Sequence, residues 1–341
     1  MMKNIQILRK KFEKYKIDGY VVPKNDEYFT EYSKINRLQI ISNFSGSAGL
    51  AVILKKKNYL FTDGRYTIQS QSESGKNFEI HGFEKLINCN LFKNLTLGID
   101  PKLFTNSQIK NFFLKNNKIK EINFNLIDQI FNKYPKHTKP FYSLNDEITG
   151  ENYKNKIEKV SKILLKVKAD YLFVSAPENI AWLLNIRGYD NPNSPLPHCR
   201  LLLKKDKNFF ILCEKSKVKN LIKEKKVTNK QIINPNNINN LFNKIRKGKF
   251  IIDDKTCSIF YNNSLIKKHK ILNKDDPIYF LKSIKNKKEI ANMVKVHIDD
   301  GVALTKFLYW IKKSNKNKIT EIDAQNKLEK FRKKNKKYLF P

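Results

Sequence analysis

Helical and extended apolar patterns alternate along the first part of this 341-residue chain. Apolar side chains recur at helical spacing over residues 5–16, and a short apolar run over 19–22 follows and ends at Pro23. This succession predicts a surface helix followed by a buried strand. The same criteria predict strands over residues 50–54, 59–62 and 95–99, and helical segments over 67–74, 107–118 and 126–132, with Ser107 as the candidate cap of the second. We therefore expect an α/β domain in which helices cover one small sheet.

The pattern repeats after residues 135–140, where two prolines among polar neighbours predict a linker. Residues 151–168 have the apolar spacing of a long amphipathic helix, and residues 169–174 predict the strand that follows it. In both halves of the chain a helix leads to an aspartate, Asp18 or Asp170, and then to a hydrophobic strand. We therefore expect the second domain to be a structural echo of the first.

The remaining apolar runs complete this second domain and lead into a helical segment. A helix is predicted over residues 177–184, with Trp182 in the core, followed by a proline-rich extended loop and by strands over 200–203, 209–213 and 250–253. A basic link over 282–288 precedes one long helix over 289–313, and Thr320 is the predicted cap of another helix. The expected organisation is two α/β domains, residues 1–140 and 141–284, and a segment, residues 285–341, that begins a further domain.

The formal charge of +36 suggests polyanion binding, but the basic residues are of an unsuitable kind. They comprise 61 lysines and only seven arginines, and the lysines lie in short runs without interleaved aromatic residues. Proteins that read bases or clamp phosphates rely on arginine's bidentate fork and on aromatic stacking platforms. We therefore expect solvated lysine faces and no specific nucleic-acid partner, with nonspecific adhesion to polyanions at low salt.

Other function classes are excluded by missing patterns. No apolar run approaches the roughly 20 residues that span a bilayer, and the first residues lack an apolar signal core. We therefore expect a cytoplasmic protein with no membrane partner. The four cysteines are scattered without a CxxC pair, which favours reduced thiols over a disulfide frame or a zinc site. The five histidines are at least 28 residues apart, and the chain has no HExxH segment, phosphate-binding loop or GxSxG motif. The chain therefore holds no self-sufficient catalytic constellation.

The most informative stretch is a small-residue loop over residues 45–49 followed by the two strands of a predicted hairpin. The second strand stops at Asp63-Gly64, a dipeptide that favours a turn, and Arg65 follows directly. An arginine held at a strand end by such a turn is suited to binding a carboxylate or a peptide carbonyl. The alternative is a plain β-hairpin with an exposed arginine.

Four segments, taken in order, resemble aminopeptidase P, the Xaa-Pro aminopeptidases of the creatinase/prolidase (pita-bread) metallopeptidase family. FSGSAG at residues 44–49 and TDGRY at 62–66 are similar to the family's N-terminal domain. AWLLNIRGYDNPNSP at 181–195 is similar to a signature of the second domain. The fourth segment includes Glu289, Met293 and HIDDG at 297–301, continues to Thr320, and resembles the start of the catalytic domain.

This resemblance covers nearly the whole chain and implies two creatinase N-terminal-like α/β domains followed by the first helices of an incomplete pita-bread domain over residues 285–341. It implies a homodimeric enzyme that removes the N-terminal residue preceding proline from peptides by two-metal hydrolysis, usually with Mn²⁺. The family's metal ligands, two aspartates, a histidine and two glutamates, would all lie beyond Pro341. Arg65 and His297 match positions that touch substrate. Arg65 would reach over from the first domain or from a partner subunit, and His297 is the candidate for substrate contact and proton transfer.

The residues alone leave other interpretations open. A single histidine on a long helix is usually a packing or surface residue. The neighbouring Asp299 and Asp300 point about 100° apart on a helix, so they cannot hold one metal ion together. We expect a C-terminally truncated aminopeptidase P that is inactive alone. The alternatives are a non-enzymatic creatinase-type binding or dimerisation module and, with less support, a lysine-rich polyanion binder.

Overall fold

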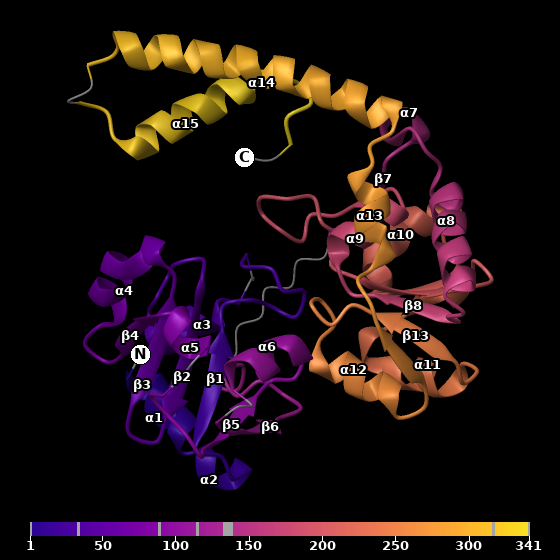
Figure 1. The fold of residues 1–341 in the computed structure, drawn as a ribbon. Helices are drawn as coiled ribbons and strands as arrows, with labels where there is room; N and C mark the ends of the chain where they lie inside the picture. The colour runs from indigo at the N-terminus through magenta and orange to yellow at the C-terminus, as the bar shows by residue number, and fades with distance from the viewer. Residues whose placement is uncertain are drawn as a thin grey trace.

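Two α/β domains and a pair of long helices make up the part of the chain that the structure describes (Figure 1). The structure, a computed structural model, describes residues 2–32, 35–87, 90–113, 116–131, 139–315 and 318–339. Each domain is built on a six-stranded sheet with helices packed against it. The predicted α/β class is therefore confirmed.

The first domain contains the sheet β4-β3-β2-β1-β5-β6. Its strands are β1 Gly19–Pro23, β2 Gly49–Leu54, β3 Asn58–Thr62, β4 Glu79–Gly82, β5 Thr96–Ile99 and β6 Lys118–Glu121. Its helices are α1 Met2–Arg9, α2 Phe12–Tyr15, α3 Arg37–Ser42, α4 Thr67–Ser74, α5 Glu84–Ile87 and α6 Asn106–Phe112, with a 3-10 turn, η1, at Gly64–Tyr66. Apolar clusters cover both faces of the sheet, so the central strand β1 is buried along its whole length.

The second domain contains the sheet β12-β11-β10-β8-β13-β14 and a small pair, β7-β9. Its strands are β7 Tyr142–Ser143, β8 Tyr171–Val174, β9 Ile186–Arg187, β10 Arg200–Lys204, β11 Phe209–Leu212, β12 Ile232–Ile233, β13 Lys249–Ile252 and β14 Lys270–Asn273. Its helices are α7 Asp146–Thr149, α8 Tyr153–Lys166, α9 Pro177–Leu183, α10 Lys219–Lys223, α11 Ile238–Lys244, α12 Ile259–Ile266 and α13 Pro277–Ser283, with 3-10 turns η2 Lys215–Val218, η3 Asn229–Gln231 and η4 Pro235–Asn237. Apolar clusters again cover both faces of the six-stranded sheet.

The two large sheets pair their strands in the same order and direction. The central strands β1 and β8 are each antiparallel to the strand that follows in the sheet, β2 or β10, and parallel to a later strand, β5 or β13. An aspartate fixes the same corner in each domain. Asp18 Oδ2 accepts the Thr96 amide at 2.9 Å, and Asp170 Oδ2 accepts the Lys249 amide at 2.9 Å. The predicted echo of the first domain in the second is confirmed, down to individual hydrogen bonds.

The two domains meet through equivalent segments. Asp100 follows β5 and Asp253 follows β13, and both carboxylates accept the amide two residues further along. Five residues after each aspartate, Thr105 and Ser258 pair with each other in an antiparallel bridge across the interface. Antiparallel pairing of equivalent residues is the arrangement that a local two-fold axis produces.

A buried arginine also joins the two domains. The Arg200 side chain is 2% exposed. Its guanidinium lies 4.3 Å from the centroid of the Tyr28 ring in the first domain and 4.4 Å from the Tyr261 ring in the second. It donates to the Glu27 carbonyl oxygen and lies 3.6 Å from the Glu27 carboxylate. A cation this deeply buried is stable only with such partners, so Arg200 ties the loop after β1 to the second domain.

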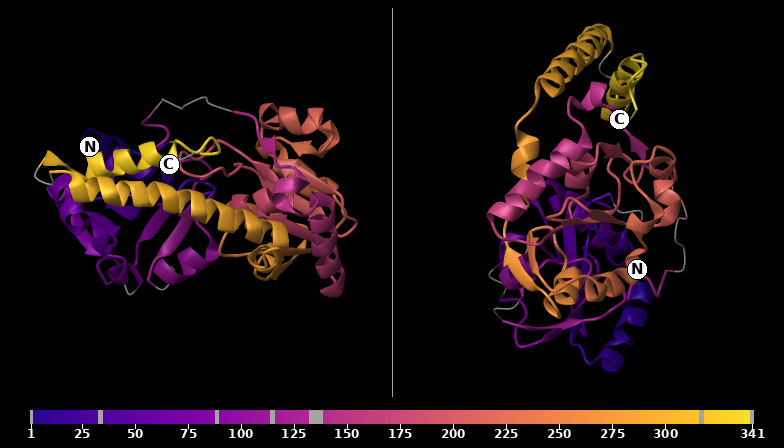
Figure 2. Two further views of the ribbon diagram at one scale, coloured as in Figure 1. Left: turned by 90° about the horizontal axis from the view of Figure 1, so that it is seen from above. Right: turned by 90° about the vertical axis from the view of Figure 1, so that its right-hand side faces the viewer.

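The last two helices stand apart from both sheets. α14 Lys287–Lys313 starts beside α7 and runs back across the molecule on the side of the first domain, and α15 Glu321–Arg332 packs against it (Figures 1 and 2). Thr320 begins α15 with a capping box, as the sequence predicts. Arg332 forms a two-pronged ion pair with Asp300, with contacts of 2.6 and 3.0 Å. Asp300 therefore serves helix packing.

Among the described residues, no helix combines the length and the apolar character that a membrane span requires. Cys199, Cys213 and Cys257 are buried free thiols, which agrees with the expected reduced state for these three. Cys89 and most of the predicted linker lie outside the described residues.

The predicted helix over residues 5–16 is interrupted and forms α1 and α2. At Lys11 the chain tightens, because the Lys11 amide donates to the Leu8 carbonyl at 3.0 Å in the 3-10 pattern. Lys16 then ends α2 with a φ of 47°. Leu8 and Phe12 are buried nonetheless. The predicted apolar face is correct, and only the continuity of the helix is wrong.

The predicted helix over residues 107–118 is wrong at both ends. Thr105, and not Ser107, caps α6, because the Thr105 side chain accepts the Gln108 amide in a capping box. Lys118 already belongs to β6, which pairs with β5 although its residues favour helix. Residues 126–130 form turns and no helix. There the Asn125 side chain accepts the Ile127 amide at 2.9 Å and takes the place of a helical bond.

Other boundaries differ by a few residues. The helix expected over 151–168 is α8, and it is closed by Lys168 with a φ of 54°. The long helix expected over 289–313 starts two residues earlier, at Lys287. The short edge strands β4, β6, β12 and β14 were not predicted, nor were the helices α3, α5, α7 and α10 to α13. Each of these strands gains its pairing from a long-range neighbour, which a local pattern does not reveal.

Candidate functional site

The two N-terminal motif segments, FSGSAG and TDGRY, form one structural unit where β2 begins and β3 ends. The hydroxyl groups of Ser47 and Tyr66, one from each segment, are 2.8 Å apart. The ring of Phe44 folds over Gly46, where a β-carbon would lie 2.2 Å from a ring carbon. The small residues of the first segment therefore let the loop pack closely, and the loop in turn positions the residues around Arg65.

Arg65 lies on the surface of the first domain, where β3 leads into η1. Asp63 Oδ1 accepts the Arg65 amide at 2.9 Å. The guanidinium forms a fork with the same carboxylate, with Nη2 2.7 Å from Oδ2 and Nε 3.1 Å from Oδ1. This hydrogen-bonded pairing holds the pKa of Asp63 below its ordinary value. Arg65 is thus oriented by Asp63, and an incoming carboxylate would have to compete with it.

His297 lies on α14 and is exposed. Its Nδ1 is 2.8 Å from the Met293 carbonyl oxygen. Because a carbonyl oxygen can only accept, Nδ1 carries the proton of this bond, and Nε2 of the neutral ring remains an acceptor. One turn further on, a β-carbon at Gly301 would meet no atom within 4 Å. His297 can therefore accept a proton from a group that approaches α14 beside Gly301.

The structure does not bring Arg65 and His297 into one site. Arg65 belongs to the surface of the first domain, and His297 belongs to α14, which starts from the second domain. In Figure 1, α4, the helix that follows Arg65, lies in the first domain and apart from α14. A joint role of the two residues in substrate binding stays a prediction.

α14 exposes an apolar surface along most of its length. Nine large apolar side chains of this helix are between 41% and 67% exposed: Ile290, Met293, Val294, Val296, Ile298, Val302, Leu304, Leu308 and Tyr309. Ala303 is the buried residue of α14 in the described part of the chain. Exposed apolar area of this extent marks a surface that packs against another element.

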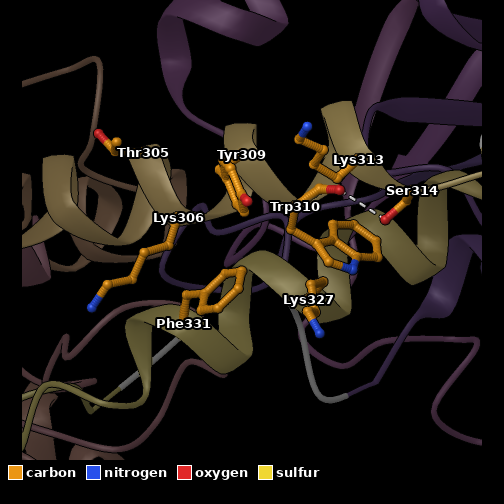
Figure 3. Close-up of a pocket in the computed structure, with 8 residues that line it drawn as sticks. All are labelled: Thr305, Lys306, Tyr309, Trp310, Lys313, Ser314, Lys327 and Phe331. Carbon is orange, nitrogen blue, oxygen red and sulfur yellow. Dashed lines mark hydrogen bonds between the residues drawn. The ribbon is translucent and has the colours of Figure 1, made fainter.

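A groove of about 700 Å³ lies between α14 and α15 (Figure 3). Its lining residues are Thr305, Lys306, Tyr309, Trp310, Lys313, Ser314, Lys327 and Phe331. Lys327 Nζ lies 5.1 Å from the centroid of the Trp310 ring and 5.6 Å from that of Phe331. The groove therefore combines aromatic walls with lysine ammonium groups, and none of its lining residues is acidic.

The described residues do not fit a two-metal centre. They contain no group of three or more His, Cys, Asp or Glu side chains that could hold a metal ion. The four described histidines lie on separate elements: His81 on β4, His198 before β10, His269 before β14 and His297 on α14. Asp253 and Asp276 are close together, but the Asp253 carboxylate accepts the Asp276 amide at 3.1 Å. These carboxylates satisfy backbone groups and organise turns.

Comparison with known families identifies this architecture. A family model described as the Creatinase/Prolidase N-terminal domain matches residues 4–126, and a second model of the same description matches residues 132–289. The chain belongs to the creatinase/prolidase family. The two matches together cover both α/β domains, so the duplicated architecture is the N-terminal architecture of this family.

Curated relatives of this creatinase/prolidase chain carry the name Xaa-Pro aminopeptidase. Xaa-Pro aminopeptidase 1 of Dictyostelium discoideum is 32% identical to it, over 97% of this chain and 57% of the relative. Xaa-Pro aminopeptidase ApepP of Drosophila melanogaster is 31% identical, over 95% of this chain and 56% of the relative. The chain therefore spans little more than half the length of the relatives it matches.

A solved structure has the same fold. The X-prolyl aminopeptidase of Caenorhabditis elegans, described as a cytosolic enzyme with a di-nuclear active site, matches with a TM-score of 0.87 and 22% identity. The match covers 99% of this chain and 60% of that one. It therefore includes both α/β domains together with α14 and α15. The predicted pair of creatinase N-terminal-like domains is confirmed.

One polar cluster was not predicted from the sequence. Trp182, expected in the core, is only partly buried against it, and its indole Nε1 donates to Glu289 Oε1 on α14 at 3.2 Å. Lys156 lies beneath this pair, 1% exposed. A signal was available, because Lys156 precedes Val160 by four residues and so occupies the apolar face of α8.

Proposed function

We propose that this chain forms the N-terminal part of an Xaa-Pro aminopeptidase, which removes the N-terminal residue that precedes proline in a peptide. The extent of the match carries this proposal. Relatives with this name match nearly the whole chain, and their match is not confined to the domains shared across the creatinase/prolidase family. The bond before proline is a tertiary amide without an N–H, which general peptidases handle poorly. We assign residues 1–140 and 141–284 to the two N-terminal domains and 285–341 to the start of a metallopeptidase domain.

The hydrolytic chemistry is proposed to reside in a part of the whole enzyme that this chain does not supply. The C. elegans relative is described as having a di-nuclear active site. Among the residues described here, no cluster fits such a centre. We therefore expect two metal ions, Mn²⁺ by resemblance to the family, to bind elsewhere in the whole enzyme. We expect the chain alone to be inactive.

The apolar surface of α14 supports the presence of a further packed domain in the whole enzyme. Covering the exposed half of an Ile or Leu side chain contributes on the order of 1 kcal/mol. Nine large apolar side chains of α14, four of them Ile or Leu, are exposed to a similar extent, so an element that covers them would dock firmly. The aromatic groove beside α15 adds a concave surface for the same contact.

Arg65 and His297 are the proposed substrate contacts. The fork that Arg65 makes with Asp63 supports its role, because it holds the guanidinium in one orientation at the surface, where a peptide or a partner subunit can reach it. The outward Nε2 of His297 supports a role as proton acceptor. We propose a cytoplasmic homodimer that acts on proline-containing peptides.

Peptide hydrolysis tests the proposal. We compare the 341-residue chain with a protein extended to the length of its relatives, on Xaa-Pro and Xaa-Ala peptides, with and without Mn²⁺. We expect release of the first residue only from Xaa-Pro peptides, only by the longer protein, and only with metal. Turnover by the 341-residue chain would show that it is not inactive alone. A longer protein without metal-dependent turnover would indicate a binding or dimerisation module instead.

The proposed substrate contacts need a separate measurement in the longer protein. We expect Arg65→Ala to raise KM without changing the bound metal content, because Arg65 would touch peptide and not metal. We expect His297→Gln to lower kcat. Arg246→Ala, at an exposed arginine of the second domain, is the matched control. A loss of metal in the Arg65 variant would limit this residue to a role in folding.

A further inference from the structure

α14 begins at a capped and anchored end. The Asn286 side chain accepts the amides of Lys288 and Glu289 at 2.9 Å, and Glu289 Oε2 accepts the Asn286 amide at 2.9 Å, which closes a capping box. The second carboxylate oxygen of Glu289 accepts the Trp182 indole N–H from α9. One glutamate therefore starts α14 and attaches it to the second domain at the same time.

A buried lysine supports this attachment from below. Lys156 Nζ donates to the Asn185 side-chain oxygen at 2.7 Å and to the Trp182 carbonyl oxygen at 3.1 Å, and lies 4.2 Å from the centroid of the Trp182 ring. Burial lowers the pKa of Lys156 to about 8. Its ammonium has carbonyl and aromatic partners, and these fix the end of α9 from which the indole reaches Glu289.

A third group of contacts at the start of α14 comes from the end of α7 and the loop after it. Asn185, with a φ of 51°, donates to the Thr149 hydroxyl at 3.1 Å and to the Glu151 carbonyl at 2.8 Å. The Asn286 side chain donates to the Thr149 carbonyl at 2.8 Å. Between these contacts Gly150 has a φ of 70°, and a β-carbon there would lie 2.4 Å from Asn286 Oδ1. The loop fits against the start of α14 only because this position is glycine.

The hydrogen bonds that join α14 to the second domain all come from residues 286–292 in the described ranges. Beyond them α14 runs free of both sheets and carries α15 (Figures 1 and 2). At 1.5 Å per residue, the helix extends about 36 Å from Glu289 to Lys313. A rotation of 10° at the anchored end would therefore displace the far end by about 6 Å.

We propose that the junction formed by Lys156, Trp182, Asn185 and Glu289 sets the direction of α14, and that these are positioning residues for whatever part of the protein α14 carries. The direction itself is a property of this chain. Its consequence for catalysis rests on the function proposed above, since α14 would then carry the hydrolytic domain. A small tilt at the junction would move that domain by several ångströms against the substrate-holding domains, and reacting groups tolerate little misplacement.

A distance measurement tests the direction of α14 in the 341-residue chain. Spin labels are placed at the exposed Lys162 on α8 and the exposed Lys312 at the end of α14, after Cys89→Ser. The other three cysteines are buried and escape labelling. We expect a narrow distribution of label-to-label distances in the parent protein. We expect Trp182→Phe combined with Lys156→Met to broaden the distribution and to shift its mean, by at most about 6 Å for a rotation of 10°.

Two further variants make the result decisive. Trp310→Phe changes the other tryptophan of the chain, which lies in the groove between α14 and α15, and should leave the distribution unchanged. If the double variant does not fold, Trp182→Phe alone decides, because it keeps an aromatic side chain and removes the part of the indole that carries the N–H bonded to Glu289. An unchanged distance distribution in the folded double variant would overturn the proposal. If the double variant does not fold, an unchanged distribution in Trp182→Phe would overturn it.

Kinetics in the longer protein test the catalytic consequence separately. We expect Trp182→Phe to lower kcat about tenfold or more on Xaa-Pro peptides while the bound metal content stays the same, since a tilted domain still holds its metal. Lys162→Met, at the exposed label position, is the control. If the longer protein has no such activity, the proposed function fails, and the distance measurement still decides whether the junction directs α14. A shifted label-to-label distance with an unchanged kcat would contradict only the proposed effect of the direction of α14 on catalysis.

Discussion

Arg200 offers a direct test of how firmly the two α/β domains are joined. The substitution Arg200→Met keeps an unbranched apolar stem of similar reach and removes the guanidinium. It therefore deletes the contacts with the Tyr28 and Tyr261 rings and the hydrogen bond to the Glu27 carbonyl. The Glu27 carboxylate is 42% exposed and can return to water, so the variant does not leave this charge buried without a partner.

The expected loss follows from these contacts. A cation packed on an aromatic ring away from water contributes about 2 kcal/mol, and Arg200 makes two such contacts. A hydrogen bond from a charged donor adds about 2 kcal/mol. The variant no longer has to remove a guanidinium from water, which offsets part of the sum. We expect a net loss of about 3 kcal/mol, located at the domain interface.

Hydrogen exchange locates that loss. The Ile259 amide donates to the Phe104 carbonyl at 2.9 Å, and the Phe260 amide donates to the Pro101 carbonyl at 3.0 Å, so both amides report on the interface. A loss of about 3 kcal/mol should speed their exchange on the order of a hundredfold. Urea unfolding followed by circular dichroism should show a lower midpoint. Arg246→Met, at an exposed arginine, should change neither quantity.

The reasoning is refuted if the two interface amides exchange in Arg200→Met as they do in the parent protein. In that case the bridge between Thr105 and Ser258 would hold the domains without the arginine. A general acceleration across both sheets, with no excess at the interface, would also contradict the argument, because it would place Arg200 in the folding of one domain.

Two further predictions concern single residues. Gly301→Ala should stabilise the 341-residue chain by up to about 1 kcal/mol in urea unfolding, because alanine favours helix and a β-carbon there meets no atom within 4 Å; a destabilised variant would show that this side of α14 is already covered. Burial raises the pKa of Asp276 to about 6, above its value near 4 in an unfolded chain. Its contribution to stability is then fully present below about pH 4 and lost as the pH rises through about 6. We expect the urea midpoint of the parent, relative to that of Asp276→Asn, to be higher at pH 5 than at pH 7. A difference between the two midpoints that does not depend on pH would disprove the shift.

Much of the fold follows from local patterns in the sequence. Residues 19–22, 50–54 and 59–62 have continuous apolar runs, and a buried central strand requires such runs whatever its neighbours are. The repeated succession of a helix, an aspartate and a hydrophobic strand predicted that the second domain echoes the first. The edge strand β6 was missed because Lys118 and its neighbours favour helix. Its backbone becomes extended through pairing with β5, which lies some twenty residues earlier.

The candidate site was predictable only in part. Sequence motifs pointed to Arg65 as a candidate substrate contact, but they did not show that Asp63 occupies its guanidinium. Trp182 was expected in the core. Its bond to Glu289 joins residues that are 107 positions apart, and only the folded chain brings these together. A buried lysine on an apolar helix face was the local clue to this junction.

The repeated architecture creates a hazard during folding. Because both sheets have the same strand order and directions, a strand of one domain has a matching place in the other, and tandem related domains misassemble by such exchange. Counted from the shared aspartates, Gly19 of β1 is equivalent to Tyr171 of β8, and Gly98 of β5 is equivalent to Ile251 of β13.

These two glycines disfavour larger side chains at their positions in the first sheet. A β-carbon at Gly19 would lie 2.9 Å from the Ile53 carbonyl oxygen, and one at Gly98 would lie 2.8 Å from the Ile17 side chain. The tyrosine of the equivalent strand therefore cannot take the place of Gly19 without a shift of the backbone, and the isoleucine could take the place of Gly98 only by displacing neighbouring side chains. Because glycine has no side chain, these two positions make the exchange of strands between the domains unfavourable. They therefore favour a single strand pairing in a chain whose two sheets are otherwise nearly interchangeable.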